Sequence, residues 1–450
     1  MQHAATEQPG QTLEGAIIRS IDGARGWRSR WRPPVLLGVT LLFDFWDIAI
    51  LSFIMPLLSA EWQLTPVAIG TLVSAGYAGQ LIGALAMGPV AERFGRLRVV
   101  VWCVSFIALF AAGCAVAPGY HAFMALRFCQ GLLLGGVTPV AIAYINELAP
   151  TSSRARFFSI FEMFMLSGWM WASMLSWMIV PHLGWRVVVA IGVFPLLLVS
   201  VVVALLPESP LWLARRRGIG AVNAALGRID VPPVEDRAYA VPDGAEQKGS
   251  ILDLFRGDLR RRTILGMFLW LMTSFVSWSL STWMPTLYVS RFNFPLQLSL
   301  QVAGIASVLY VVTLPLVGVL LDRFGRRRVA ITGTSLSTLV FLAIAASPEL
   351  PRPLLVALIV SGQMGISAAI TTLWPYTAEI YPTRVRAVAM SFSSSFARAG
   401  SMINPIVIGF ILSAGGSANL IFLLLGVLAI GVTCLWVFFT RETAGRRMDG

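Results

Sequence analysis

The sequence predicts an all-α integral membrane protein with twelve membrane-spanning helices in two six-helix bundles. Hydrophobic residues make up 57% of the chain and charged residues only 12%, whereas a soluble domain carries about 25% charged residues. Runs of roughly 20 apolar residues recur along the chain, each long enough to cross a ~30 Å hydrocarbon core as a helix. The short alternating segments of a membrane β-barrel are absent. An internal repeat also divides the chain into two similar halves.

Twelve apolar segments define the expected spans. They lie near residues 34–58, 68–91, 98–117, 121–148, 156–180, 186–206, 263–290, 298–321, 328–346, 352–380, 386–414 and 417–440. These spans predict a six-helix bundle at 34–206 and a second at 263–440, joined by a cytoplasmic linker at 207–262. Cytoplasmic tails are expected at 1–33 and 441–450, and the first of these has no cleavable apolar core of a signal peptide.

The linker is expected to contain two short amphipathic helices on the membrane surface, at 211–229 and 251–262. Between them, residues 231–250 are rich in proline, glycine and acidic residues. Such a composition predicts a flexible segment that tethers the two bundles.

The arginines occur in alternate loops. They cluster before the first span and in every second loop after it, while the intervening loops hold little beyond Arg186, Arg291 and Arg352. This positive-inside pattern predicts a multi-pass protein of a bacterial inner membrane with both termini in the cytoplasm. The net charge of +12 therefore reflects topology and does not indicate a nucleic-acid partner. The expected partners are the lipid bilayer and a small-molecule substrate, and the chain is expected to be a monomer.

The cysteines and histidines do not form a recognisable metal or disulfide pattern. All four cysteines lie inside apolar runs, and the three histidines have no neighbouring ligand. We expect no metal site and no cofactor. No nucleophile or acid–base cluster is evident, so an enzyme is not expected. The sequence has no glycine-rich loop of the kind that binds phosphates, so ATP is not expected to be the energy source.

The two halves of the chain repeat one another. Residues 88–98 align with residues 318–328, and Glu147 aligns with Glu379 at nearly the same separation. Two matches at one period predict parallel six-helix repeats related by an axis along the membrane normal.

The repeated segment resembles the major facilitator signature G-x-x-x-[DE]-R-x-G-R-[RL]-R, which implies the major facilitator fold over the whole chain. Its acidic residue can pair with a nearby arginine and a facing helix end, which would hold one gate state, and its later glycine permits a tight reversal. An alternative is that these loops only fix the topology. The expected gating residues are Gly88, Glu92, Arg93, Gly95, Arg96, Glu147, Gly318, Asp322, Arg323, Gly325, Arg326, Glu379 and Arg384.

Within that superfamily the chain resembles proton-coupled carriers of the aromatic acid and niacin type. Asp44-Phe-Trp-Asp47 is similar to their D-G-x-D motif, with Phe45 in place of glycine, and the segments Trp283-x-Pro285 and Phe396-Ala-Arg398-Ala-Gly400 also resemble theirs. The resemblance implies a secondary active transporter that takes up a small organic anion by alternating access. A carboxylate is expected, an aromatic one being an option, with the proton as coupling ion.

Two other transport functions stay open. Two segments resemble parts of sugar porters and favour a sugar or polyol:proton symporter. They are Pro207-Glu208-Ser209-Pro210 and Arg441-Glu442-Thr443. Proton-driven efflux of amphipathic compounds is the other, although the span at 156–180 lacks the G-x-x-x-G-P-x-x-G-G run of drug antiporters.

Charged residues inside the spans are the main site candidates, because each costs ~2.5–3.5 kcal/mol near the bilayer centre. Asp44 and Asp47 lie near the midplane on one helix face, and two carboxylates so close in a low dielectric do not both ionise easily. We expect them to carry protons. Arg398, also near the midplane, is expected to anchor the substrate carboxylate in a cavity shared with both aspartates. The alternative is a permanent ion pair between Arg398 and one of them.

Two further charges have less defined roles. Glu162 is either a second proton carrier or the partner of a loop arginine. Arg127 is either a substrate ligand or a packing group against a neighbouring helix end. An aromatic and amide wall suits a planar acid, although tryptophans facing lipid would give the same pattern. The expected cavity residues are Trp169, Trp278, Tyr310, Gln363 and Trp374.

Overall fold

The computed structural model describes residues 12–24, 31–235, 239, 250–347 and 350–443. Most of the predicted flexible segment 231–250 and the outer parts of the predicted tails 1–33 and 441–450 lie outside the described residues. Within the described part, twelve helical segments are long and apolar enough to cross a membrane, and each overlaps one predicted span. The prediction of an all-α membrane protein is confirmed.

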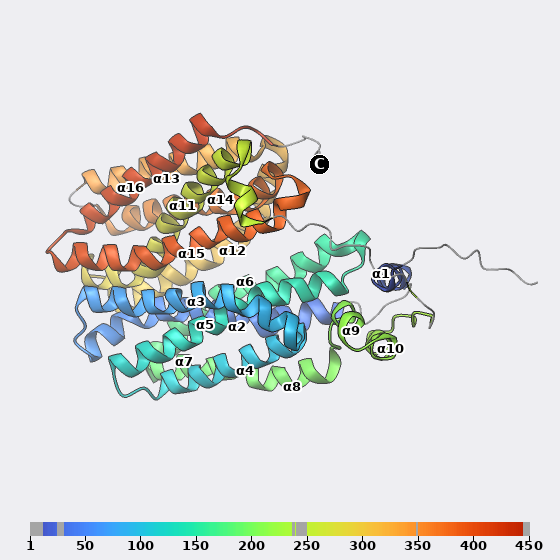
Figure 1. Cartoon of the computed structure of the whole chain (residues 1–450). Helices are drawn as coiled ribbons and strands as arrows, with labels where there is room; N and C mark the ends of the chain where they lie inside the picture. Colours follow the sequence, from blue (N-terminus) through green and yellow to red (C-terminus); the bar gives the residue numbers. More distant parts are fainter. Residues whose placement is uncertain (1–11, 25–30, 236–238, 240–249, 348–349, 444–450) are drawn as a thin grey trace, which may run out of the picture.

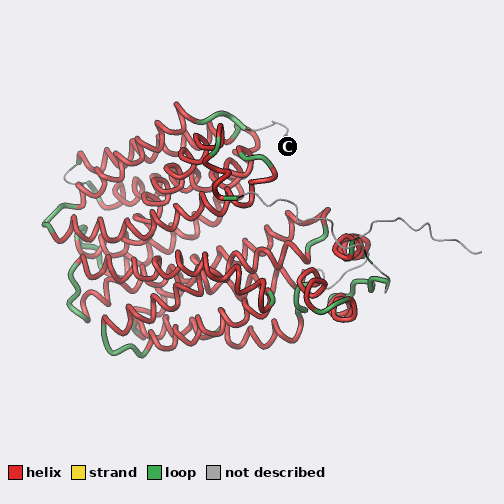
Figure 2. Tube along the Cα trace, in the orientation of Figure 1, coloured by secondary structure: helices red, strands yellow, loops and turns green. Residues whose placement is uncertain are grey.

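The helices form two six-helix bundles that lie side by side (Figure 1). The first bundle contains α2 (Arg32–Glu61), α3 (Pro66–Phe94), α4 (Arg96–Ala115), α5 (Tyr120–Leu148), α6 (Arg154–Leu183) and a sixth span made of α7 (Trp185–Ala190), η3 (Ile191–Val193) and α8 (Pro195–Leu205). The second contains α11 (Gly257–Ser290), α12 (Leu296–Phe324), α13 (Arg326–Ala346), α14 (Arg352–Ile380), α15 (Thr383–Ser413) and α16 (Ala418–Cys434) with its π-helical end η5 (Leu435–Phe439). Short loops connect most neighbouring helices (Figure 2).

Shorter helices lie outside the bundles. α9 (Pro210–Arg216), α10 (Ile219–Gly227) and η4 (Ile251–Phe255) fall in the linker, at the positions of the expected amphipathic segments. α11 begins at Gly257, six residues before the expected start at residue 263. Arginine is a good helix former, and a helix extends past the membrane wherever its charged turns reach water, so apolar length alone placed that boundary too late.

The predicted N-terminal tail contains a helix that the sequence analysis did not anticipate. In α1 (Leu13–Gly23), Ile17 and Ile21 are buried. Thr12 Oγ1 accepts a hydrogen bond from the Gly15 amide at 3.2 Å and caps the helix start. α1 packs beside α9 (Figure 1), so part of the tail belongs to the folded protein.

The internal repeat extends to helix packing. A Cβ atom on Gly168 of α6 would overlap the carbonyl oxygen of Leu42 on α2, and a Cβ on Gly400 of α15 would overlap that of Leu271 on α11. The α2–α6 and α11–α15 crossings therefore bring two backbones into contact, and both need glycine at the same position of the repeat.

The two bundles diverge toward the end of the molecule where α9 and α10 lie, which we call the linker end (Figure 1). At the opposite, far end, α3 and α15 touch. Ser74 Oγ donates to the Met402 carbonyl at 2.7 Å, and a Cβ on Gly70 would overlap the Pro405 carbonyl. The bundles are thus in contact at the far end and separated at the linker end.

Candidate functional site

A cavity of about 150 Å³ lies between the two bundles. Residues of α2 and α6 line it from the first bundle, and residues of α11, α12 and α14 line it from the second. None of the described residues that line it carries a charge. Its aromatic lining residues are Phe45, Phe53, Trp169, Trp278, Tyr288 and Tyr310. The cavity is smaller than the ~300–1,000 Å³ typical of sites for drug-sized ligands, and its size suits a single small ring.

Four of the five expected cavity residues line this space: Trp169, Trp278, Tyr310 and Gln363. The rings of Trp169 and Trp278 come from opposite bundles and meet edge to face, with centroids 5.5 Å apart. Trp278 also meets Tyr77 of α3, with centroids 6.1 Å apart. Aromatic contacts between the bundles therefore bound the cavity.

Trp374, the fifth expected cavity residue, does not line this cavity. Its side chain is 51% exposed, and its ring packs on Trp270 with centroids 4.9 Å apart. Trp374 lies eleven residues after Gln363 on α14, which is about 16 Å nearer the linker end. Trp374 therefore lies on the same face of α14 as Gln363 but outside this cavity, toward the linker end.

Gln363 is the main polar group of the cavity. Its Nε2 donates to Ser281 Oγ at 3.4 Å and to Ser367 Oγ at 3.5 Å. Its Oε1 is buried and has no hydrogen-bond partner among the described residues. Ser277 and Ser307 add hydroxyl groups to the lining. A mostly apolar cavity with a few polar groups is typical of small-molecule sites, and Gln363 offers one unused hydrogen-bonding atom there.

The two aspartates are buried inside the first bundle and do not line the cavity. Arg127 of α5 donates through Nη1 to Asp47 Oδ2 at 3.1 Å and through Nη2 to the Asp47 carbonyl at 2.8 Å. Its Nη1 also donates to Gln130 Oε1 at 2.9 Å. Thr138 Oγ1, also on α5, donates to Asp44 Oδ2 at 3.2 Å. Both carboxylates are therefore held by α5.

Arg398 does not share a cavity with the aspartates, contrary to expectation. It is half-buried on α15 and takes part in none of the ion pairs among the described residues. The ion-pair partner of Asp47 is Arg127 instead, because α5 packs beside α2 within the same bundle. Glu162 is half-buried on α6 and likewise forms no ion pair with a described loop arginine.

Phe45 connects the cavity with the buried acids. Its ring lines the cavity, while Asp44 and Asp47 on the same helix contact α5. Successive residues of a helix point about 100° apart, so one turn of α2 serves both sites. The position at which this chain departs from the D-G-x-D pattern is therefore a wall of the cavity.

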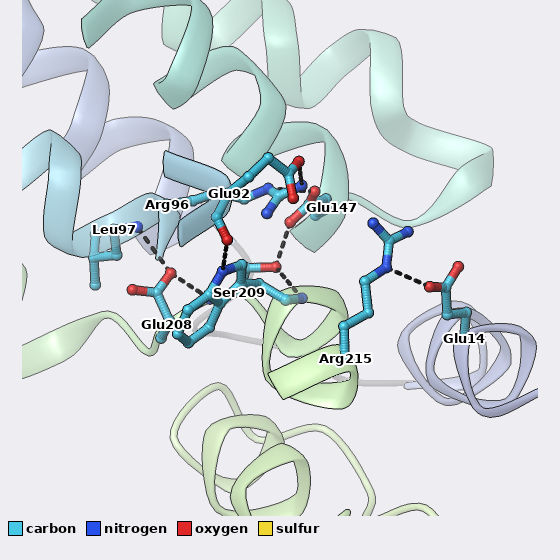
Figure 3. Close-up of polar contacts among 9 residues, drawn as sticks. Glu14, Glu92, Arg96, Leu97, Glu147, Glu208, Ser209 and Arg215 are labelled. Atoms are coloured by element: carbon cyan, nitrogen blue, oxygen red, sulfur yellow. Dashed lines mark hydrogen bonds and ion pairs between the residues drawn. The ribbon is translucent and has the colours of Figure 1, made fainter. Parts of the chain in front are cut away.

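A network at the linker end connects α3, α4, α5 and α9 (Figure 3). Arg96 forms ion pairs with Glu147 at 2.6 Å and with Glu92 at 3.1 Å. Glu208 accepts hydrogen bonds from the amides of Leu97 at 2.8 Å and Arg98 at 3.2 Å. A carboxylate at a helix N-terminus stabilises the helix through its unpaired amides and its dipole, so Glu208 caps α4.

Ser209 and Arg215 extend this network. The Ser209 hydroxyl donates to Glu147. At the edge of the network, Arg215 Nε donates to Glu14 at 2.6 Å (Figure 3), and this hydrogen bond raises the pKa of the Arg215 guanidinium. The network thus links the first bundle to α9 and α1.

The second bundle repeats the arrangement. Arg326 forms ion pairs with Glu379 at 3.0 Å and Asp322 at 3.5 Å. Glu442 accepts from the amides of Arg326 at 2.8 Å and Arg327 at 3.1 Å. Thr443 donates to Glu379, as Ser209 does to Glu147. Both networks join helices within one bundle.

The remaining expected gating residues lie around these networks. Gly95 and Gly325 have φ of 108° and 90°, which confirms the expected need for glycine at the reversal. Arg93 and Arg323 lie over the rings of the adjacent phenylalanines, at 5.3 and 5.5 Å.

Three expected gating residues, Gly88, Gly318 and Arg384, take no part in the two networks around Arg96 and Arg326. A Cβ on Gly88 or Gly318 would meet open space. Arg384, 63% exposed, forms an ion pair with Asp253 of η4 at 3.7 Å.

Sequence reasoning missed the roles of Glu208 and Glu442. Both were noted only as parts of a linker motif and a tail motif. A signal was available, because Glu208-Ser209 and Glu442-Thr443 recur at almost the same separation as the two copies of the signature. Searching the ends of the spans for the repeat would have paired them.

Two bundles of six spans around a central cavity are an arrangement typical of membrane transporters. The family model described as "Sugar (and other) transporter" matches residues 38–450, and the chain belongs to this family. The structure is similar to the partially occluded inward open conformation of the xylose transporter XylE from E. coli, with a TM-score of 0.74 at 17% identity. The match covers 96% of this chain and 100% of that one. The major facilitator fold is confirmed.

Two relatives show which subgroup the chain resembles. It is 29% identical over 429 residues to the niacin transporter NiaP of Acinetobacter baylyi, covering 92% of this chain and 94% of that one. It is 30% identical over 401 residues to the gallate transporter of Pseudomonas putida, covering 88% of this chain and 89% of that one. The predicted resemblance to carriers of aromatic acids and niacin is confirmed.

Proposed function

We propose that the protein is a proton-coupled importer of a small aromatic carboxylate in a bacterial inner membrane. The observation that carries the proposal is the uncharged aromatic cavity between the bundles, with one unused amide atom at Gln363. The relatives named for niacin and gallate, both aromatic carboxylates, support the substrate class. The cavity lies within one chain, which supports a monomer as the working unit, with the proton as the coupling ion and no cofactor.

Substrate recognition combines ring packing with hydrogen bonds. The ring of the acid lies among the six aromatic side chains, and Gln363 and the neighbouring serines bond its polar groups. Transferring an ionised carboxylate from water into an uncharged apolar site is costly. Because no arginine among the described residues lines the cavity, the charge of the substrate has to be balanced from elsewhere.

The proton supplies that balance through the Asp47–Arg127 pair. With Asp47 ionised, the buried pair is neutral overall. Protonation of Asp47 leaves Arg127 as an uncompensated cation in a low-dielectric bundle, where its field on the neighbouring cavity is strong. A substrate anion restores neutrality, so proton and anion bind together, and in this proposal Arg127 takes the role expected of Arg398. Asp44, which lies one turn away, is the second candidate proton carrier, and Glu162 is a third.

The arginine distribution supports a cytoplasmic position for the linker end. In that orientation the bundles diverge toward the cytoplasm, and alternating access requires them to close there and part at the far end. The repeated linker-end networks around Arg96 and Arg326 keep the ends of each bundle together during this movement. This stiffening is the part of the expected gating role that the networks support, through Glu92, Arg96 and Glu147 and their counterparts Asp322, Arg326 and Glu379.

The test is uptake into proteoliposomes of purified protein, using labelled nicotinate, benzoate and xylose with and without an inward proton gradient. We expect gradient-driven accumulation of an aromatic acid. Asp47→Asn should abolish that accumulation and keep exchange of labelled for unlabelled acid, because exchange needs no net proton movement. Undiminished accumulation by this variant would exclude Asp47 as the coupling site.

The matched control is Glu61→Gln. Glu61 lies on the same helix and forms an ion pair with Arg186 at 2.7 Å, but both side chains are more than a third exposed. This variant should accumulate substrate as the unmodified protein does. Accumulation of xylose alone would favour the sugar symporter, and extrusion of amphipathic compounds would favour efflux.

A further inference from the structure

A second cavity, of about 400 Å³, lies between the start of α11 and the end of α16. It shares no lining residue with the central cavity. Its wall contains Arg260, Arg261, Ile264, Phe268, Leu435 and Phe439. We propose that this groove binds one anionic phospholipid, with its phosphate on the two arginines and an acyl chain along the apolar side chains.

The two arginines are free to bind a phosphate. Both are exposed, and neither takes part in an ion pair among the described residues. The adjacent Arg262 differs, since it pairs with Asp258 at 3.6 Å and donates to the Ile380 carbonyl at 2.6 Å. A guanidinium presents a planar set of donors that matches phosphate oxygens. Arg260 and Arg261 therefore form a cationic rim on the groove.

The depth of the groove in the membrane matches a phospholipid. α11 has 34 residues and is about 51 Å long, so it extends well beyond a ~30 Å hydrocarbon core. Its first turns, with Arg260, lie at headgroup depth. Ile264 and Phe268 follow one and two turns later on the same face and are 38% and 53% exposed. The groove changes from cationic to apolar in the direction in which a lipid does.

The opposite wall is a widened helical turn held by hydrogen bonds. Leu435–Phe439 is π-helical, a feature found often at functional sites. Arg327 donates through Nη2 to the Val437 carbonyl at 2.6 Å and through Nε to the Trp436 carbonyl at 3.3 Å. Phe439, at the end of this segment, lines the groove and is 53% exposed. Basic pockets between membrane helices on one leaflet are typical sites for anionic headgroups.

The experiment is native mass spectrometry of the full-length protein in detergent, titrated with phosphatidylglycerol. We expect one tightly bound lipid. The double variant R260Q/R261Q should bind it about thirtyfold more weakly, since each surface arginine contributes roughly a fivefold factor toward an anionic lipid. The control R216Q/R217Q removes two exposed arginines of the linker, on which no described ion pair depends, and should leave binding unchanged. An equal loss in both double variants would overturn the proposal.

A second comparison separates the lipid from its headgroup. The variant F268S/F439S should weaken binding of phosphatidylglycerol while keeping the arginine rim. Inorganic phosphate at matched concentration should not displace the lipid from the unmodified protein. Displacement by phosphate, or equal binding of phosphatidylcholine, would show that the groove does not select an anionic phospholipid.

Discussion

At the residue scale, one turn of α2 joins the cavity and the buried acids. Phe45 faces the cavity, whereas Asp44 and Asp47 contact Thr138 and Arg127 of α5. A change in the bonds of either aspartate therefore acts on a helix that also carries a wall of the cavity. In the proposed mechanism, this arrangement gives proton binding at Asp47 a short physical route to the cavity.

The size of the side chain at position 45 should determine how large an aromatic acid the central cavity can bind. Phe45→Gly, which restores the residue type of the resembled motif, should enlarge the cavity and weaken binding of a one-ring acid such as benzoate by about tenfold, since contact between two aromatic rings contributes about 0.5–1.5 kcal/mol beyond the area that it buries. Larger two-ring acids should gain affinity relative to benzoate. The measurement is a set of dissociation constants for acids of increasing size.

Phe45→Leu is the control for that variant. It keeps an apolar side chain and avoids the loss of about 1 kcal/mol that glycine causes in a helix. Its size preference should fall between those of the unmodified protein and Phe45→Gly. An unchanged preference in all three proteins would mean that Phe45 does not shape the substrate site.

At the scale of elements, the linker end of each bundle depends on a capped helix. Glu208 accepts the first amides of α4, and Glu442 accepts those of α13. The following hydroxyl residue bonds Glu147 or Glu379 in each case. Each cap therefore attaches the chain that leaves the bundle's last helix to the loop that joins its second and third spans.

Glu208→Gln and Glu442→Gln should each lower the melting temperature by a few degrees. The amide keeps the shape but loses the charge that interacts with the helix N-terminus, an effect of about 0.3–2 kcal/mol. Since the two caps lie in different bundles, their effects should add in the double variant. The measurement is thermal unfolding of the purified protein in detergent.

The control for the caps is Asp258→Asn. Asp258 also lies in the first turn of a helix, α11, but it is 95% exposed and pairs with Arg262 at 3.6 Å. At a salt concentration that screens exposed charges, both its ion pair and its interaction with the helix N-terminus contribute little. Its melting temperature should match that of the unmodified protein. Cap variants that melt as this control does would show that the caps do not stabilise the bundles.

At the scale of the whole molecule, the two bundles touch through their backbones at the far end. Gly70 meets Pro405, and Gly409 meets Pro66, at distances that leave no room for a Cβ atom. The close approach of the two bundles at the far end therefore requires glycine at positions 70 and 409. A transporter that alternates its access must break this contact in every cycle.

Gly70→Val should therefore separate the bundles at the far end and slow uptake. The distance between spin labels on exposed Ala60 and Ala414, one on each bundle, should shift to longer values in a variant whose native cysteines are replaced by serine. The matched control is Gly119→Val, because a Cβ there meets open space and its φ of 178° suits any residue. The same distance distribution in all three proteins would contradict the far-end contact.

Local features of the sequence were enough for the architecture. The length of each apolar run, the alternation of arginines and the duplicated signature predicted twelve spans in two bundles, and four of five expected cavity residues line the cavity. These features succeed because the bilayer imposes a fixed thickness and requires every backbone hydrogen bond to be made within a helix. Each membrane-spanning helix can therefore be predicted from its own segment of the sequence.

Only the tertiary structure decided which charges meet. The sequence placed Asp47, Arg127 and Arg398 at suitable depths, but depth along a helix does not say which neighbour its face meets. The packing of α5 beside α2 pairs Arg127 with Asp47 and leaves Arg398 on another helix. The same holds for Glu208 and Glu442, whose partners lie more than a hundred residues away in sequence. Contacts between helices depend on rotation and crossing geometry, which arise only when all the segments pack together.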